Sequence, residues 1–184
     1  MLLVSLKENR CIMFRKITFV AIHLAIAFAL MAQPPQTKEE FEKQYQKRIQ
    51  QEVLDGVYIP ADLTDAFVQL NKLIDPESKA KFKAMAEEDA VHKLYFSFGR
   101  WIIHNWGFYG GSRLSHHIRD LGITFPEDMA AFIILSYHRN LNRKELKIKE
   151  QVTYYQEKIK KEQEERLEKG KVIHEETKKV NKGN

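Results

Sequence analysis

The chain contains a single cysteine, Cys11, which stands before the apolar run of residues 17–31 and not after it. In that position Cys11 cannot be the lipid acceptor that follows the apolar run of a lipoprotein signal. If the run is a signal peptide and is removed, no thiol remains for disulfides, thiolate catalysis or cysteine metal sites. The stability of the mature protein then has to come from the packing of apolar side chains.

The sequence also lacks any sustained alternation of apolar and polar residues, the pattern typical of a half-buried strand. Apolar residues recur at helical spacing instead, and at 43% of the chain they suffice for a core. We therefore predict an all-α protein: a compact bundle of about five helices, with an amphipathic helix before it and a long charged helix after it.

A clustered basic surplus is missing from the part expected to fold. Gln33 to Leu141 carries 13 Lys and Arg against 15 Asp and Glu, whereas Asn142 to Asn184 carries 13 against 9. A nucleic-acid-binding groove needs its basic residues gathered on the folded surface. We therefore predict no nucleic-acid partner.

The N-terminal residues have the pattern of a secretory signal. Met13 to Lys16 form a short basic region, and Ile17 to Met31 are almost continuously apolar. As a helix the run would reach only ~24 Å, short of a ~30 Å hydrocarbon core, which disfavours an uncleaved anchor. We predict that translation starts at Met13 and that residues 1–32 are leader and signal peptide, cleaved after Ala32. The mature protein is then expected to be periplasmic or secreted, without a stable membrane span.

Three segments are expected after the signal. Residues 33–56 comprise a proline-containing linker and an amphipathic helix that begins at a Thr37 capping box and ends near Asp55-Gly56. Residues 57–142 form the helical domain. Residues 143–184 form a charged helical tail, predicted to be disordered from Gly170 onward.

Within the domain, cap and periodicity signals predict a series of helices. They cover residues 62–74, a short helix from Pro76, a central helix from Glu87 to Trp106, and two helices at 113–121 and 126–141, the last preceded by a capping box at Thr124. The tail contains four apolar residues with 4-3-4 spacing, namely Ile148, Val152, Tyr155 and Ile159. This spacing favours a helix that packs on the domain, and a homodimeric coiled coil is the alternative.

No residue pattern indicates a metal or cofactor. The neighbouring histidines His116 and His117 would point about 100° apart on a helix, and no His-x-x-x-His pair occurs. Ser112 and Ser115 lack the surroundings of a nucleophile elbow. We therefore predict no metal, no cofactor and no assigned catalytic residue.

The block from Leu94 to Leu141 holds both tryptophans and five of the eight glycines. Trp101 is expected in the core, whereas Trp106, Phe108 and Tyr109, at a helix end and loop, are expected on the surface. The glycine pair before Ser112 either turns the chain tightly between two packed helices or, beside Arg113, binds an anion.

Several short motifs of the domain together resemble a family of small uncharacterised bacterial domains, over Val57 to Asn142. The resemblance implies a compact helical domain of unknown function and no activity. The matching pieces are Tyr58-Ile59-Pro60-x-Asp62-Leu63-x-x-Ala66-Phe67, Trp101-Ile102-x-x-Asn105-Trp106-Gly107, Gly111-Ser112-Arg113-Leu114, Pro126-x-Asp128-Met129 and Ser136-Tyr137-His138-Arg139-x-Leu141.

From these residues we predict a non-catalytic module that binds an unknown protein or a cell-envelope ligand. The alternative is an envelope enzyme that acts on a polar or anionic substrate through His138, Arg113 and Asp128, which would have to share one cleft. The candidate binding residues are the exposed aromatic and motif-borne polar ones: Asn105, Trp106, Tyr109, Arg113, Asp128, Tyr137, His138 and Arg139.

Overall fold

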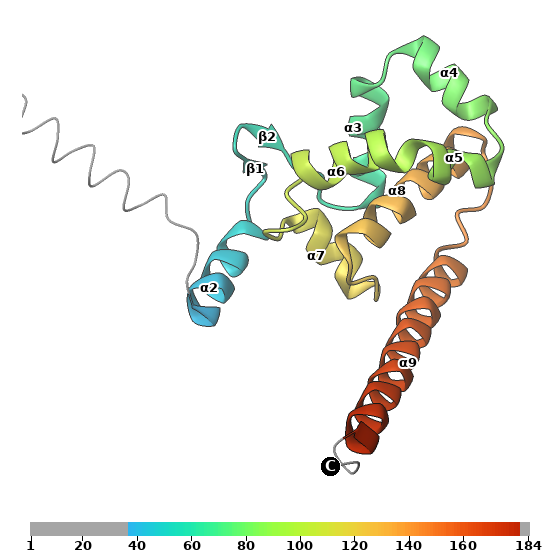
Figure 1. The fold of residues 1–184 in the computed structure, drawn as a ribbon. Coiled ribbons are helices and arrows are strands. Elements are labelled where there is room, and N and C mark those ends of the chain that lie inside the picture. The colour runs from blue at the N-terminus through green and yellow to red at the C-terminus, as the bar shows by residue number, and fades with distance from the viewer. Residues whose placement is uncertain (1–36, 181–184) are drawn as a thin grey trace, which may run out of the picture. The chain divides into compact units, whose positions relative to one another are not determined.

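The computed structural model describes residues 37–180, with side chains for residues 37–170 (Figure 1). The predicted signal peptide, start codon and proline linker lie outside the described residues. The chain divides into two compact units, residues 1–44 and residues 45–184, and the boundary falls within the first described helix. The helical domain lies in the second unit.

The first described helix, α2 (Lys38–Arg48), begins as predicted. The Thr37 Oγ1 accepts from the Glu40 amide at 3.1 Å, and the Thr37 amide donates to the Glu40 carboxylate at 3.4 Å, which is a capping box. The predicted end near Asp55-Gly56 is wrong, because α2 stops at Arg48.

A hairpin of two short antiparallel strands follows, β1 (Val53–Leu54) and β2 (Val57–Tyr58). Asp55 and Gly56 both have positive φ, at 51° and 80°, as the central residues of a type I′ turn require. The Asp-Gly pair is a known signal for this turn, so the missed hairpin was readable as a turn and not as a helix end.

The domain that follows is helical, as predicted. Its elements are α3 (Leu63–Leu73), α4 (Pro76–Ala84), α5 (Glu87–Leu94), the π-helical segment η1 (Tyr95–Gly99), α6 (Arg100–Asn105), α7 (Arg113–Asp120) and α8 (Pro126–Leu141). Asp62 and Asp75 cap α3 and α4 through their side chains. The capping box predicted at Thr124 is wrong, since Phe125 precedes α8 without a side-chain cap.

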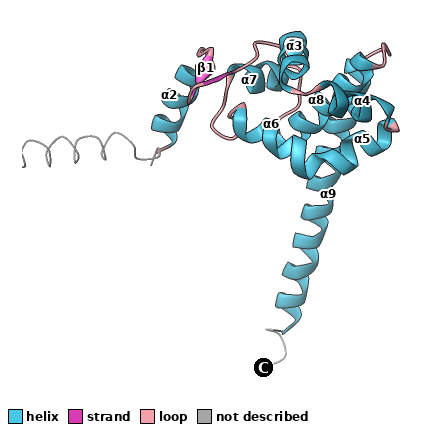
Figure 2. Cartoon of the chain, turned by 90° about the horizontal axis from the view of Figure 1, so that it is seen from above, coloured by secondary structure: helices cyan, strands magenta, loops and turns pink. Residues whose placement is uncertain are grey.

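Helix α8 lies in the middle of the domain and contacts α3, α4, α5, α6, α7 and α9 (Figures 1 and 2). The segment from Glu87 to Trp106, predicted as the central helix, packs against one side of α8. The reason is burial: nine residues of α8 are buried, among them Phe132, Ile133 and Tyr137. The core therefore surrounds α8.

The π-helical segment η1 changes which residues of the following helix face the core. A π turn contains one extra residue, which rotates the downstream side chains by about 100°. Ile102 and Ile103 are buried, whereas Trp101 is 37% exposed, so its predicted core position is wrong. Trp106 and Phe108, predicted on the surface, are each only 1% exposed.

The last helix, α9 (Ile148–Val180), starts after a loop and packs its first turns on the domain. Tyr155 is buried, and Gln151 donates to the Ser136 hydroxyl of α8 at 3.1 Å. This matches the favoured interpretation of the apolar seam, while pairing of two such helices stays a prediction. The helix continues to Val180, and the disorder predicted from Gly170 stays a prediction.

Within residues 37–180, we find no helix that combines the length and the apolar character needed to cross a membrane.

Candidate functional site

Two of the predicted binding residues, Tyr137 and His138, are buried inside the domain. The Tyr137 hydroxyl donates to the Asn71 side chain at 3.1 Å, and burial raises the pKa of Tyr137 to about 12. The His138 Nε2 lies 3.1 Å from the Met85 carbonyl oxygen. Both residues tie α8 to α3 and to the end of α4, and neither is accessible to a ligand.

Arg139 is held by structural contacts at the same end of α8. Its Nε donates to the Glu87 carboxylate at 2.9 Å, and its guanidinium also donates to the Leu146 carbonyl at 2.9 Å. The hydrogen bond from Arg139, followed by the contact with Lys144, lowers the pKa of Glu87. Arg139 therefore joins α5, α8 and the loop before α9.

Arg113 connects α7 to the hairpin. Its Nε donates to the Ile59 carbonyl at 2.7 Å, and its guanidinium lies over the Tyr58 ring and 3.4 Å from the Glu52 carboxylate. These contacts hold the guanidinium against the hairpin, where its Nη2 is buried without a hydrogen-bond partner. The glycine pair beside it belongs to a tight turn, as the favoured alternative predicts.

Asp128 is buried at the start of α8 and forms an ion pair with Lys158 of α9 at 2.7 Å. The hydrogen bond to Asp128 raises the pKa of Lys158. About 15 Å of helix separates Asp128 from His138 at ~1.5 Å per residue. Since Arg113 is committed to the hairpin, the three side chains of the alternative enzyme hypothesis do not share a cleft.

Of the three remaining predicted residues, one is buried, one is partly buried and one is exposed. Trp106 is buried, and the Asn105 side chain donates back to the Trp101 carbonyl at 2.9 Å. Tyr109 is 68% exposed, as predicted. Three of the eight predicted binding residues line surface cavities. Asp128 and Arg139 line one formed by α5, α8 and α9. Tyr109 lines another, together with the Arg100 guanidinium, which has no ion pair among the described residues.

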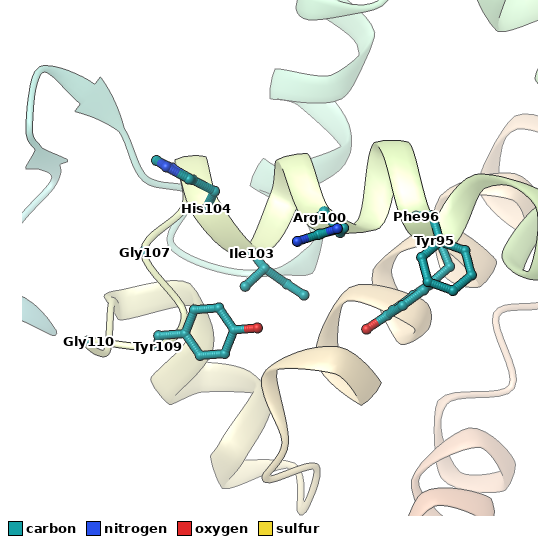
Figure 3. A pocket seen from close by; sticks show the side chains of 8 residues that line it. All are labelled: Tyr95, Phe96, Arg100, Ile103, His104, Gly107, Tyr109 and Gly110. Carbon is teal, nitrogen blue, oxygen red and sulfur yellow. The ribbon is translucent and has the colours of Figure 1, made fainter.

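That cavity, which we call the α6 hollow, has a volume of about 600 Å³ and opens to solvent (Figure 3). The volume lies within the range of roughly 300–1,000 Å³ that is typical of small-ligand sites. Helical residues form one wall and the loop after α6 forms the other: Tyr95, Phe96, Arg100, Ile103 and His104 on the helix, and Gly107, Tyr109 and Gly110 on the loop.

The π-helical segment positions the tyrosine at one end of the α6 hollow. A Cβ added at Gly99 would lie 3.2 Å from the Tyr95 ring, so the ring rests against the glycine backbone. π-helical turns frequently mark functional sites, because the widened turn re-aims side chains. Here it leaves Phe96 projecting into solvent with 75% of its surface exposed.

The rings of Tyr95 and Tyr109 lie on either side of Arg100, with their hydroxyls directed into the space between (Figure 3). Tyr109 donates to the Glu127 carboxylate at 2.9 Å, and this hydrogen bond raises the pKa of Tyr109. Burial, followed by the charge of Glu127, raises the pKa of Tyr95, although Arg100 opposes both effects. Both phenols are therefore protonated hydrogen-bond donors at neutral pH.

The sequence prediction missed most of the α6 hollow: Tyr95, Phe96, Arg100 and His104. A signal was present, because Phe96, Arg100 and His104 follow one another at steps of four and thus share a helix face. The described residues contain no cluster of three His, Cys, Asp or Glu side chains that could hold a metal ion.

Comparison with known proteins finds a similarity to one family and no activity. Residues 59–141 match the model of the family described as "Domain of unknown function (DUF6794)", which confirms the resemblance to a family of unknown function. Neither a curated protein nor a solved structure matches the chain significantly.

Proposed function

We propose that this chain, whose residues 59–141 are similar to a family of unknown function, is an exported, non-catalytic module that binds a cell-envelope polymer in the α6 hollow. The observation that carries the proposal is the pairing of exposed aromatic rings with an unpaired arginine in one cavity. Phe96 and Tyr109 expose apolar ring faces, on which the rings of sugars stack.

The remaining polar residues of the domain favour this location. Arg113, Asp128, His138 and Arg139 all have partners within the fold, so they support its architecture. In the α6 hollow, by contrast, the exposed side chains of Arg100 and His104 form no hydrogen bond or ion pair with the described residues. Side chains that are free of such contacts are the better candidates for binding a ligand.

Export rests on the basic and apolar pattern of residues 13–31, ahead of Ala32. When the natural chain is expressed, we expect the protein in the periplasmic extract with Gln33 as its N-terminal residue. Intact mass and N-terminal sequencing check this result. Recovery of a chain that still carries residues 17–31, or of cytoplasmic protein alone, would refute export.

The binding proposal is tested by retention of the purified protein on insoluble cell-wall peptidoglycan, a polymer of sugar rings and short peptides. We expect the double variant Phe96→Ala/Tyr109→Ala to bind about tenfold more weakly, because each aromatic contact contributes roughly 0.5–1.5 kcal/mol. Both side chains are exposed, so their removal leaves the fold intact.

Tyr154→Ala is the matched control, because this tyrosine of α9 is 62% exposed and lies outside the α6 hollow. It should bind like the wild type. If the wild type is not retained, or if the control loses as much affinity as the double variant, the proposed function is wrong.

A further inference from the structure

We infer that the α6 hollow selects an acidic ligand, with the guanidinium of Arg100 pairing with a carboxylate of the envelope polymer while sugar rings lie on Phe96 and Tyr109. This inference rests on the proposed function and adds the charge of the ligand to it. The geometry that points to it is an exposed arginine, without a partner of its own, between two aromatic walls.

Arg100 differs from the structural arginines of the domain. Arg48, Arg113 and Arg139 each donate to a backbone carbonyl, at distances of 2.7–3.0 Å. The guanidinium of Arg100 has no hydrogen bond or ion pair with any residue that the structure describes. An arginine held in a cavity without an acid beside it presents all its donors to whatever enters.

The charges around Arg100 leave room for one negative group. Among the described residues that line the α6 hollow, none carries a carboxylate. Glu127 accepts the Tyr109 hydroxyl and forms no ion pair with Arg100. Asp128 is paired with Lys158. An incoming anion therefore meets a guanidinium that no carboxylate of the described residues pairs with.

The second donor is the hydroxyl of Tyr95, which forms no hydrogen bond with the described residues. Together with the planar fork of Arg100 it can hold a carboxylate by charge-assisted hydrogen bonds. One arginine balances one carboxylate charge, whereas a phosphomonoester carries close to two at neutral pH and would retain an unbalanced charge in the cavity. The α6 hollow therefore fits a carboxylate better than a phosphomonoester.

The test compares peptidoglycan before and after its carboxyl groups are converted to neutral N-methylamides by carbodiimide coupling with methylamine. We expect the wild type to bind the neutralised polymer about tenfold more weakly, because a charge-assisted hydrogen bond is lost. Arg100→Gln should bind native polymer as weakly as the wild type binds the neutralised one, and should not respond to neutralisation. Arg100→Lys, which keeps the charge but not the fork, should be intermediate.

Arg166→Gln is the charge-matched control. Arg166 is exposed on α9, so this substitution removes the same charge from a position outside the α6 hollow. It should retain both the affinity and the response to neutralisation. Equal binding of the wild type to native and neutralised polymer overturns the inference, as does an Arg100→Gln variant that still responds to neutralisation. If the inference fails in this way but Phe96→Ala/Tyr109→Ala still loses binding to the native polymer, the proposed function remains supported. Failure of the wild type to bind native polymer removes both.

Discussion

Replacing Trp106 with alanine is expected to lower the free energy of unfolding by about 4 kcal/mol. Truncation of a fully buried tryptophan typically destabilises a protein by roughly 3–5 kcal/mol, through lost apolar burial and the cavity left behind. Trp106 is 1% exposed and its ring meets the edge of Trp101 with centroids 5.9 Å apart. Urea unfolding followed by far-ultraviolet circular dichroism measures the change without relying on tryptophan fluorescence.

Trp101→Ala is the informative comparison, because the two residue types are identical and only their environments differ. Trp101 is 37% exposed and stacks on Phe98, so less of its surface leaves water on folding. We expect its substitution to destabilise the protein by no more than about 2 kcal/mol. If Trp101→Ala proved the more destabilising of the two, the rotation of α6 by the π-helical segment would be incorrect.

The second large effect is expected at Gly111, where alanine should destabilise the fold by about 3 kcal/mol. Its φ of 83° is unfavourable for a residue with a Cβ, at roughly 1–2 kcal/mol. An added Cβ would also lie 2.2 Å from the Tyr45 ring, and such overpacking lowers the free energy of unfolding by a further ~1–3 kcal/mol. The ring cannot move aside freely, because the Tyr45 hydroxyl lies 3.0 Å from the His116 Nδ1. The thermal midpoint of unfolding measures the loss.

The neighbouring Gly110 provides the control. Its φ is not positive, and the nearest atom to an added Cβ is the Nε of Arg48 at 3.2 Å, near the end of a flexible side chain. Gly110→Ala should therefore change stability by less than about 1 kcal/mol. Equal effects at the two glycines would mean that the turn is not fixed by Tyr45, and would reopen the anion-binding alternative.

The helices of the domain could be predicted closely because their signals are local. The side-chain caps Asp62 and Asp75, the proline at the start of α4 and the glycine after α7 each act within one turn of the residues they terminate. The Asp-Gly turn of the hairpin is equally local. The hairpin was nevertheless missed, because apolar residues at steps of four continue from the helix to Val53, the first residue of β1.

The candidate site could not be predicted in the same way. Its walls depend on the π-helical segment at Tyr95–Gly99, and the sequence there, YFSFG, is compatible with an ordinary helix. One extra residue in a turn rotates the side chains that follow it, so Trp101 faces outward and Trp106 faces inward, opposite to the prediction. The polar motif residues were predicted as ligand contacts because a sequence does not show which of its charges find partners within the fold.

The amino-acid sequence by itself determined the helical class, the main helix limits within the domain and the resemblance to a family of unknown function, since periodicity, caps and motifs act over a few residues. The tertiary structure alone decided which polar groups are free. Arg113, Asp128 and Arg139 pair with residues 15 or more positions away or with distant carbonyls, whereas Arg100 does not. Such pairing depends on how α8 brings remote segments together, and it leaves the Arg100 guanidinium of the α6 hollow without a partner among the described residues.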